Sequence, residues 1–154
     1  MKTLARLIAT WFGCGYAPAA PGTAGSLAAM ALGWLLWRFA GFGPGHFLIL
    51  GGAAIAPGIW AASVVARETG SGDPAIVVID EVVGQWIALG GAAVFNWKSW
   101  LAAFVLFRLF DIWKLPPARQ LDRIAGGVGI VFDDVASGIY AALVLRAAGW
   151  FNLY

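Results

Sequence analysis

The sequence contains few charged residues for its length. Asp, Glu, Lys and Arg make up 12% of its 154 residues, whereas hydrophobic residues make up 61%. Soluble globular domains carry roughly twice that share of charge, so too little polar surface remains to surround the apolar core in water. This shortage excludes an ordinary soluble domain, and we expect lipid to cover part of the surface of an integral membrane protein.

Cysteine and histidine are almost absent. Cys14 is the single cysteine, which excludes an intrachain disulfide and a thiolate metal cluster. His46 is the single histidine, and we expect it on the far side of the membrane from the acidic residues, so Ser–His hydrolysis lacks a local base. The net charge is only +2, which leaves too few cations for a nucleic-acid-binding surface.

Apolar segments separated by polar or glycine-rich loops predict an all-α, polytopic membrane protein. Residues 2–12 are predicted to form a short amphipathic helix. Five apolar segments follow, at about 24–40, 47–66, 80–97, 99–113 and 133–150. A spanning helix needs roughly 20 residues, which only the second segment reaches comfortably. We therefore expect four to five spanning helices in a single membrane-embedded domain, residues 1–154.

The charges divide unevenly between the two ends of this bundle. With five spans and a cytoplasmic N-terminus, seven cations lie on the inner side and three on the outer side, as the positive-inside rule requires. The same topology places all eight acidic residues inside: Glu68, Asp73, Asp80, Glu81, Asp111, Asp122, Asp133 and Asp134. The sequence therefore predicts a polar site at the cytoplasmic membrane surface.

Two acidic pairs, Asp80-Glu81 and Asp133-Asp134, are each expected at the start of a helix. Adjacent carboxylates repel each other unless a cation bridges them, and carboxylates without His or Cys favour Mg²⁺, Mn²⁺ or Ca²⁺. Helix N-capping is the alternative, but capping explains one acid per helix better than two. We predict that the four carboxylates are metal ligands.

A third charged group is Arg108, Asp111 and Lys114, whose spacing of three places them on one helical face. Ionisable groups among aromatic and aliphatic residues are costly in a membrane unless they face a polar interior. Arg108 and Lys114 are predicted to bind substrate, although a lysine that snorkels to the membrane surface is a serious alternative for Lys114. The predicted catalytic residues are Asp80, Asp111 and Asp134.

Two glycine-rich stretches are candidates for phosphate binding. In residues 122–129, Arg123 can fork onto phosphate oxygens and Gly127 allows close approach of the backbone. In residues 21–26, Thr23 or Ser26 could cap a helix whose N-terminus holds a phosphate. The alternatives are a flexible loop for the first stretch and simple capping for the second.

Carboxylates, cations and glycine-rich turns together indicate phosphoryl chemistry, and a site at the membrane surface indicates a lipid phosphate. Two routes are open: a water attacks phosphorus with Asp111 as base, or an aspartate attacks first and forms a phospho-enzyme. We favour the water, because a carboxylate held by a cation is a poorer nucleophile.

Four stretches carry a resemblance to the phosphatidylglycerophosphatase A family: APAAPGTAGSLAA, IVVIDEVVGQWIAL, FRLFDIWKLPPARQLDR and GGVGIVFDDVASGIYAAL. They extend over most of the chain, with one departure at Leu115, which separates Lys114 from the proline pair. The resemblance implies an all-helical, Mg²⁺-dependent phosphatase of the bacterial inner membrane. It implies phosphatidylglycerophosphate as substrate, with phosphatidylglycerol and inorganic phosphate as products.

Two other functions are possible for these residues. One is a phosphatase for another lipid phosphate, such as phosphatidic acid or a polyprenyl phosphate. The other is a small transporter that uses buried acids as a relay. A relay would place its acids at mid-membrane depth, whereas these acids are predicted at helix starts and in loops on one side, which argues against a transporter.

Overall fold

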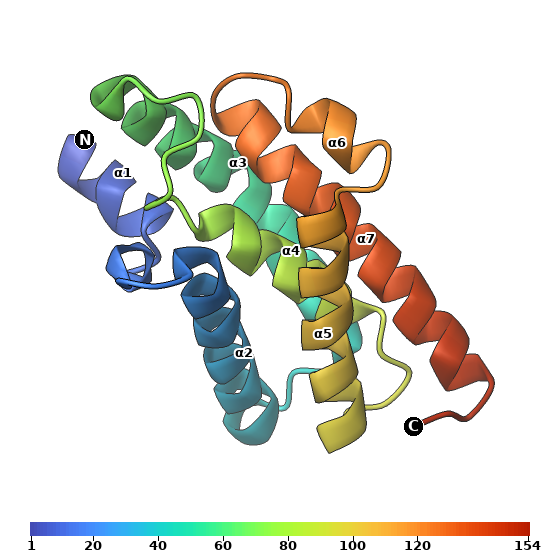
Figure 1. Cartoon of the computed structure of the whole chain (residues 1–154). Helices are drawn as coiled ribbons and strands as arrows, with labels where there is room; N and C mark the ends of the chain where they lie inside the picture. Colours follow the sequence, from blue (N-terminus) through green and yellow to red (C-terminus); the bar gives the residue numbers. More distant parts are fainter.

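The computed structural model describes residues 1–154, and its secondary structure is entirely helical, as predicted (Figure 1). The elements in chain order are α1 (Lys2–Ala9), the 3₁₀ helix η1 (Cys14–Tyr16), α2 (Pro21–Ala40), α3 (Pro44–Thr69), α4 (Ile79–Gly90), α5 (Trp97–Trp113), α6 (Ala118–Leu121) and α7 (Gly127–Trp150). The start of α7 and the end of α3 lie at the same end of the bundle as α1 (Figure 1).

Helix α4 is the centre of the bundle, packed against α2, α3, α5 and α7 (Figure 1). Every residue from Val82 to Leu89 is buried. Its 12 residues give a length of only about 18 Å at 1.5 Å per residue, against about 30 Å for the hydrocarbon core of a bilayer. The predicted segment 80–97 is therefore wrong at its end: the helix stops at Gly90 and acts as a core helix.

The next helix begins at its own capping residue. The Asn96 side chain accepts hydrogen bonds from the backbone N–H groups of Lys98 and Ser99, at 2.9 and 3.0 Å. The Ser99 hydroxyl in turn accepts from the Asn96 backbone N–H at 2.9 Å. This reciprocal capping box satisfies donors that the first turn leaves without partners, so α5 starts two residues before the predicted segment.

Two helices, α3 and α7, are long and apolar enough to cross a membrane. Large apolar side chains on the outer faces of the bundle are exposed, among them Trp34, Leu35, Ile49, Leu101, Val105 and Leu143. Exposed apolar surface of this extent is unfavourable in water and is matched by lipid. The structure thus agrees with a membrane protein.

The polar end of the bundle differs from the prediction in its boundaries. Helix α7 begins at Gly127, so Asp133 and Asp134 lie in its second turn and not at its start. The predicted loop 67–74 is helical as far as Thr69, and α1 is held against α3 by ion pairs from Lys2 and Arg6 to Glu68, at 3.5 and 2.8 Å. The N-terminal ends of α2 and α4 and the C-terminal end of α5 face this second turn of α7 around one pocket.

Helices α4 and α7 approach each other through two glycines. A Cβ atom at Gly138 would lie 2.5 Å from the Gly84 carbonyl oxygen, and one at Gly84 would lie 2.7 Å from the Asp134 carbonyl oxygen. Only glycine permits backbones this close. The two positions therefore determine how far the carboxylate of Asp134 stands from the start of α4.

We predict that Gly138→Ala destabilises the protein by about 1–3 kcal/mol, the usual cost of overpacking, because the added methyl group pushes α7 away from α4. Thermal unfolding in detergent measures the change. Gly52→Ala is the matched control, since a Cβ there meets no atom within 4 Å, and helix propensity alone favours alanine. Equal stability of the two variants would contradict this role for Gly138.

Candidate functional site

A polar cavity of about 220 Å³ lies at the end of the bundle where α2 and α4 begin and α5 ends. We call it the acidic pocket, because six carboxylates and only two cations line it. Its charged residues are Asp73, Asp80, Glu81, Arg108, Asp111, Lys114, Asp133 and Asp134, joined by Pro21, Gly22, Ala75, Val77 and Ile130. Four helices and the loop before α4 contribute to its wall, so its composition depends on the tertiary fold.

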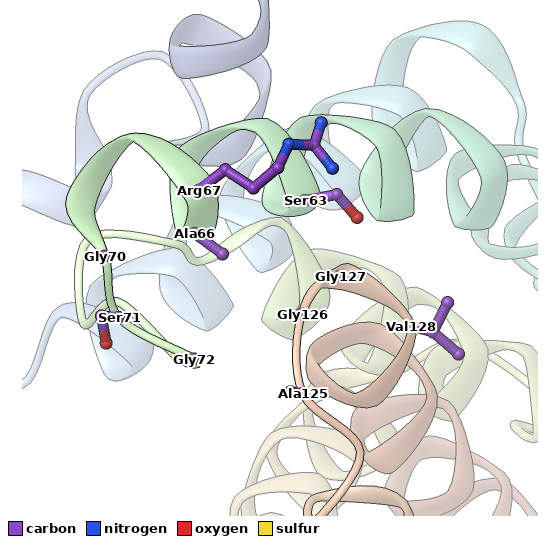
Figure 2. Close-up of a pocket in the computed structure, with 10 residues that line it drawn as sticks. All are labelled: Ser63, Ala66, Arg67, Gly70, Ser71, Gly72, Ala125, Gly126, Gly127 and Val128. Atoms are coloured by element: carbon purple, nitrogen blue, oxygen red, sulfur yellow. The ribbon is translucent and has the colours of Figure 1, made fainter.

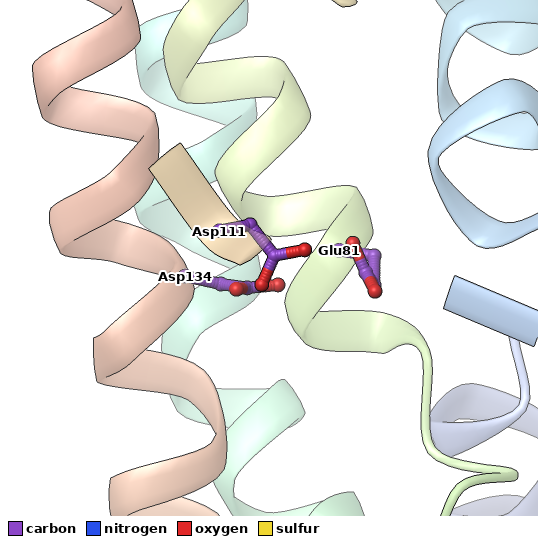
Figure 3. A group of neighbouring side chains, drawn as sticks. All are labelled: Glu81, Asp111 and Asp134. Atoms are coloured by element: carbon purple, nitrogen blue, oxygen red, sulfur yellow. The ribbon is translucent and has the colours of Figure 1, made fainter. Parts of the chain in front are cut away.

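Three carboxylates converge in this pocket from three different helices. Oxygens of Glu81 (α4), Asp111 (α5) and Asp134 (α7) all lie within 4.8 Å of one another. Figure 3 shows Asp111 and Asp134 side by side, with Glu81 facing them from α4. Three negative charges at this separation repel one another strongly. An all-oxygen ligand set of this size fits a hard divalent cation such as Mg²⁺ or Ca²⁺.

Arg108 is the cation that contacts this acidic triad directly. Its Nη1 atom pairs with Glu81 and lies 2.8 Å from an Asp111 oxygen. The Ser26 hydroxyl lies 3.1 Å from Glu81 and also 3.1 Å from the Gly22 carbonyl oxygen, so it donates to one of them at a time. One guanidinium therefore balances three carboxylates only in part, and the triad keeps a net negative charge.

Lys114, directly after the end of α5, forms two ion pairs beside the triad. Its Nζ atom lies 2.5 Å from an oxygen of Asp133 and 2.5 Å from one of Asp122. Burial alone would lower the pKa of Lys114, but the hydrogen bonds that its ammonium group donates to these two carboxylates raise the pKa above its usual value. Lys114 therefore stays cationic, and it holds Asp133 by an ion pair outside the triad.

Asp80 contributes a buried carboxylate oxygen that has no hydrogen-bond partner. Its Oδ1 atom is buried and makes no hydrogen bond, although the residue lines the acidic pocket. A buried carboxylate oxygen without a donor is costly. This atom therefore needs a ligand, a proton or a cation from the pocket, and it is an independent sign that the pocket is built to hold something.

The structure brings most of the predicted site residues together. Seven of them line the acidic pocket: Asp80, Glu81, Arg108, Asp111, Lys114, Asp133 and Asp134. Ser26 joins them through Glu81. The triad contains two of the four predicted metal ligands, Glu81 and Asp134, together with Asp111. The other two predicted ligands, Asp80 and Asp133, lie outside the triad.

The other three predicted substrate-binding residues lie outside the pocket wall. Thr23 is in the first turn of α2, next to Gly22. Arg123 lines an adjoining cavity. Gly127 is buried where α7 packs on α3, and a Cβ there would collide with the Ile59 carbonyl oxygen, so its lack of a side chain serves helix packing.

Sequence reasoning missed two residues of the pocket. Asp73 lies in the loop before α4 and lines both the acidic pocket and the cavity beside it. The sequence signal for Asp73 was that it is one of the acidic residues predicted on the inner side. Gly22 permits α2 to approach Glu81, because a Cβ at this position would collide with the Glu81 carboxylate. The signal for Gly22 was the Pro-Gly pair that begins α2.

Comparison with known proteins gives consistent matches along the chain. The family model for phosphatidylglycerophosphatase A matches residues 7–149. A relative from Bacteroides thetaiotaomicron, named "Putative phosphatidylinositol-3-phosphatase", is 41% identical over 94% of this chain and 92% of its own length. No solved structure matches the chain.

Two further relatives are named phosphatidylglycerophosphatase A. The one from Escherichia coli is 37% identical over 93% of this chain and 82% of its own length. The one from Haemophilus influenzae is 38% identical over 96% of this chain and 90% of its own length. The family model's match, which extends from residue 7 to residue 149, includes every residue that lines the acidic pocket.

We predict that the triad binds a divalent cation. Mn²⁺ is a suitable probe, because it accepts the same oxygen ligands as Mg²⁺ and electron paramagnetic resonance reports the bound ion. Glu81→Gln and Asp134→Asn should each weaken Mn²⁺ binding by about tenfold or more, since each removes one charged ligand. Glu68→Gln, which removes a carboxylate outside the pocket, is the control. Unchanged affinity in both pocket variants would place the ion elsewhere.

Proposed function

Because the chain belongs to the phosphatidylglycerophosphatase A family, we propose that it hydrolyses phosphatidylglycerophosphate to phosphatidylglycerol and inorganic phosphate. The chain is an enzyme of the lipid phosphatase class. The observation that carries the substrate is the family match, which spans 7–149 and so covers the whole acidic pocket. The Bacteroides relative supports a second candidate substrate, the 3-phosphate of phosphatidylinositol.

We further propose that the enzyme uses Mg²⁺, held by Glu81, Asp111 and Asp134. The support is the spacing of their oxygens, within 4.8 Å, and a donor set made only of carboxylates. When bound, the ion would neutralise charge on the substrate phosphate and on these three groups. Asp133 remains paired with Lys114, so it would shape the site and keep Lys114 in place.

Arg108 is suited to bind the phosphate to be released. Its contacts with Glu81 and Asp111 both use Nη1, so the remaining N–H groups of the guanidinium are available to phosphate oxygens. Lys114 adds a second positive charge to the pocket lining. As the phosphorus–oxygen bond to the lipid breaks, these cations stabilise the charge that develops on the oxygens.

We propose that water attacks the phosphorus directly and that Asp80 accepts its proton. The support is the buried, unpaired Oδ1 atom of Asp80, whereas Glu81, Asp111 and Asp134 form the triad and Asp133 is paired with Lys114. The triad residue Asp111 is less suited to this role than the sequence suggested, since Arg108 and two neighbouring acids engage it.

The proposed topology puts this chemistry at the cytoplasmic face of the inner membrane of a bacterium. We propose that α2 and α5 cross the bilayer beside α3 and α7, while α4 remains inside the bundle. Residues 1–154 then form one membrane-embedded domain with four spans. The support is the direction of the helices, because α2, α4 and α7 start, and α3 and α5 end, towards the same end of the bundle (Figure 1).

We predict that purified protein in detergent releases phosphate from phosphatidylglycerophosphate, that EDTA abolishes this release, and that added Mg²⁺ restores it. A parallel panel of phosphatidylinositol 3-phosphate, phosphatidic acid and a polyprenyl phosphate ranks the candidate substrates by kcat/KM. Full activity in EDTA would exclude the metal, and a higher kcat/KM for another lipid would replace the proposed substrate.

We predict that Asp80→Asn lowers kcat by about a hundredfold or more, within the range for loss of a general base, while Mn²⁺ binding is retained. The two readouts separate proton transfer from metal binding. Loss of both activity and Mn²⁺ binding would identify Asp80 as a metal ligand instead, and near-normal kcat in a folded variant would remove it from the reaction.

A further inference from the structure

The acidic pocket is the first of three neighbouring cavities, which together we call the groove. A cavity of about 270 Å³, lined in part by Arg123, shares Asp73 and Ile130 with the acidic pocket. A third cavity, of about 440 Å³ and lined in part by Arg67, shares Gly72 and Ala125 with the second. We call the third cavity the Arg67 cavity. The shared residues place the three cavities next to one another along the protein surface.

The arginines of the second and third cavities lack the ion pairs that the cations of the acidic pocket form. Arg108 and Lys114 are each paired with two carboxylates. Arg67 and Arg123 form no ion pair, because the six ion pairs of the structure use other cations. Glu68, next to Arg67 in sequence, is occupied by Lys2 and Arg6. The charge of Arg67 is therefore available to a ligand.

The Arg67 cavity offers donors and no negative charge. Its lining contains no acidic residue: it consists of Ser63, Ala66, Arg67, Gly70, Ser71, Gly72 and residues 125–128. Figure 2 shows Arg67 and Ser63 on α3, above the loop at Gly70–Gly72 and the turn that leads into α7. The Ser63 side chain makes no hydrogen bond within the protein, whereas the structure satisfies the hydroxyls of Ser26, Ser99 and Ser137. Such a cavity attracts an anion that brings acceptors and no protons.

Both candidate substrates carry an anion of this kind. Phosphatidylglycerophosphate and phosphatidylinositol 3-phosphate each contain a phosphomonoester, which is hydrolysed, and a phosphodiester, which joins the polyol to diacylglycerol. With the monoester in the acidic pocket, the diester needs a separate place towards the acyl chains. We propose that the Arg67 cavity is the subsite for this phosphodiester, an inference that rests on the proposed function.

The position of Arg67 fits the depth of a phosphodiester in a membrane. Arg67 is exposed in the last turn of α3, one of the two helices long and apolar enough to cross a bilayer. A cation at the end of such a helix lies at the level of the lipid headgroups. The exposed side chain of Val128 at the edge of the cavity lies where the diacylglycerol would leave towards the bilayer.

This subsite makes a lipid with two phosphates a better substrate than phosphatidic acid. In phosphatidic acid the single phosphomonoester is attached directly to diacylglycerol, so the lipid has no diester and no polyol to reach along the groove. The subsite thus selects the substrate class by the distance between two phosphates, while the acidic pocket selects the monoester.

The test compares Arg67→Gln with Arg119→Gln in full-length protein in mixed micelles. Arg119 is also exposed at the inner end of the bundle and makes no ion pair, yet it lines none of the three cavities. Arg67→Gln should raise KM for phosphatidylglycerophosphate by about tenfold or more, the usual effect of losing a charge-assisted hydrogen bond, with kcat within about twofold of the wild-type value. Arg119→Gln should behave as wild type.

Binding of phosphatidylglycerol, measured by native mass spectrometry, is the second readout, because this lipid contains the diester and no monoester. Arg67→Gln should weaken this binding and Arg119→Gln should not. Normal KM and normal binding in Arg67→Gln, or equal losses in both variants, would overturn the subsite. If the wild-type protein fails to hydrolyse phosphatidylglycerophosphate while binding still depends on Arg67, the proposed function fails and the diester subsite stands.

Discussion

Gly84 of α4 and Gly138 of α7 allow two helix backbones to touch, and the arrangement of the site depends on this contact. The Cβ of any other residue at Gly138 would lie 2.5 Å from the Gly84 carbonyl oxygen. Because Asp134 lies one turn before Gly138, and Glu81 one turn before Gly84, the contact sets the separation of these two carboxylates. Asp111 completes the triad from α5, which packs against both α4 and α7. A bundle with larger side chains between α4 and α7 would have the same charges and no common ligand site.

The close packing of α4 and α7 brings carboxylates together, and their repulsion costs free energy. The cations of the pocket offset only part of this repulsion. Carboxylates within 4.8 Å of one another in a partly buried cavity destabilise the fold unless positive charge is near. Arg108 and Lys114 supply two charges against six acids. A bound cation would relieve this deficit and could also provide a partner for the unpaired Oδ1 of Asp80. The stability of this end of the bundle and the proposed metal requirement are therefore two consequences of one arrangement.

The same charges explain how one small bundle can recognise a membrane lipid. The paired cations hold the acidic pocket together and, in the proposed function, would bind the phosphate to be released, whereas the unpaired Arg67 lines a separate cavity. In the proposed topology both sites open at the ends of the helices, at the level of the lipid headgroups. A soluble phosphatase would have to extract its substrate, but a pocket built at the ends of lipid-covered helices meets the headgroup in place.

The sequence by itself determined the all-helical membrane class, the family resemblance, and seven of the residues that line the acidic pocket. These follow from local properties: apolar segment length, charge content and the doubling of acids in short motifs. Helix ends were less predictable. Residues 127–132 contain two glycines and two valines before the acidic pair and look like a loop in isolation, yet packing against α3 and α4 makes them the first turns of α7.

Only the tertiary structure decided which carboxylates share a ligand site. In sequence, Asp133 and Asp134 are equivalent neighbours, but successive residues of a helix point about 100° apart. Asp134 therefore meets Glu81 and Asp111, while Asp133 turns to Lys114. The groove to Arg67 was also hidden, since it joins the end of α3 to the start of α7, about 60 residues apart in the chain. Contacts between segments that are far apart in the chain depend on how the helices pack, and no local pattern in the sequence shows which segments will meet.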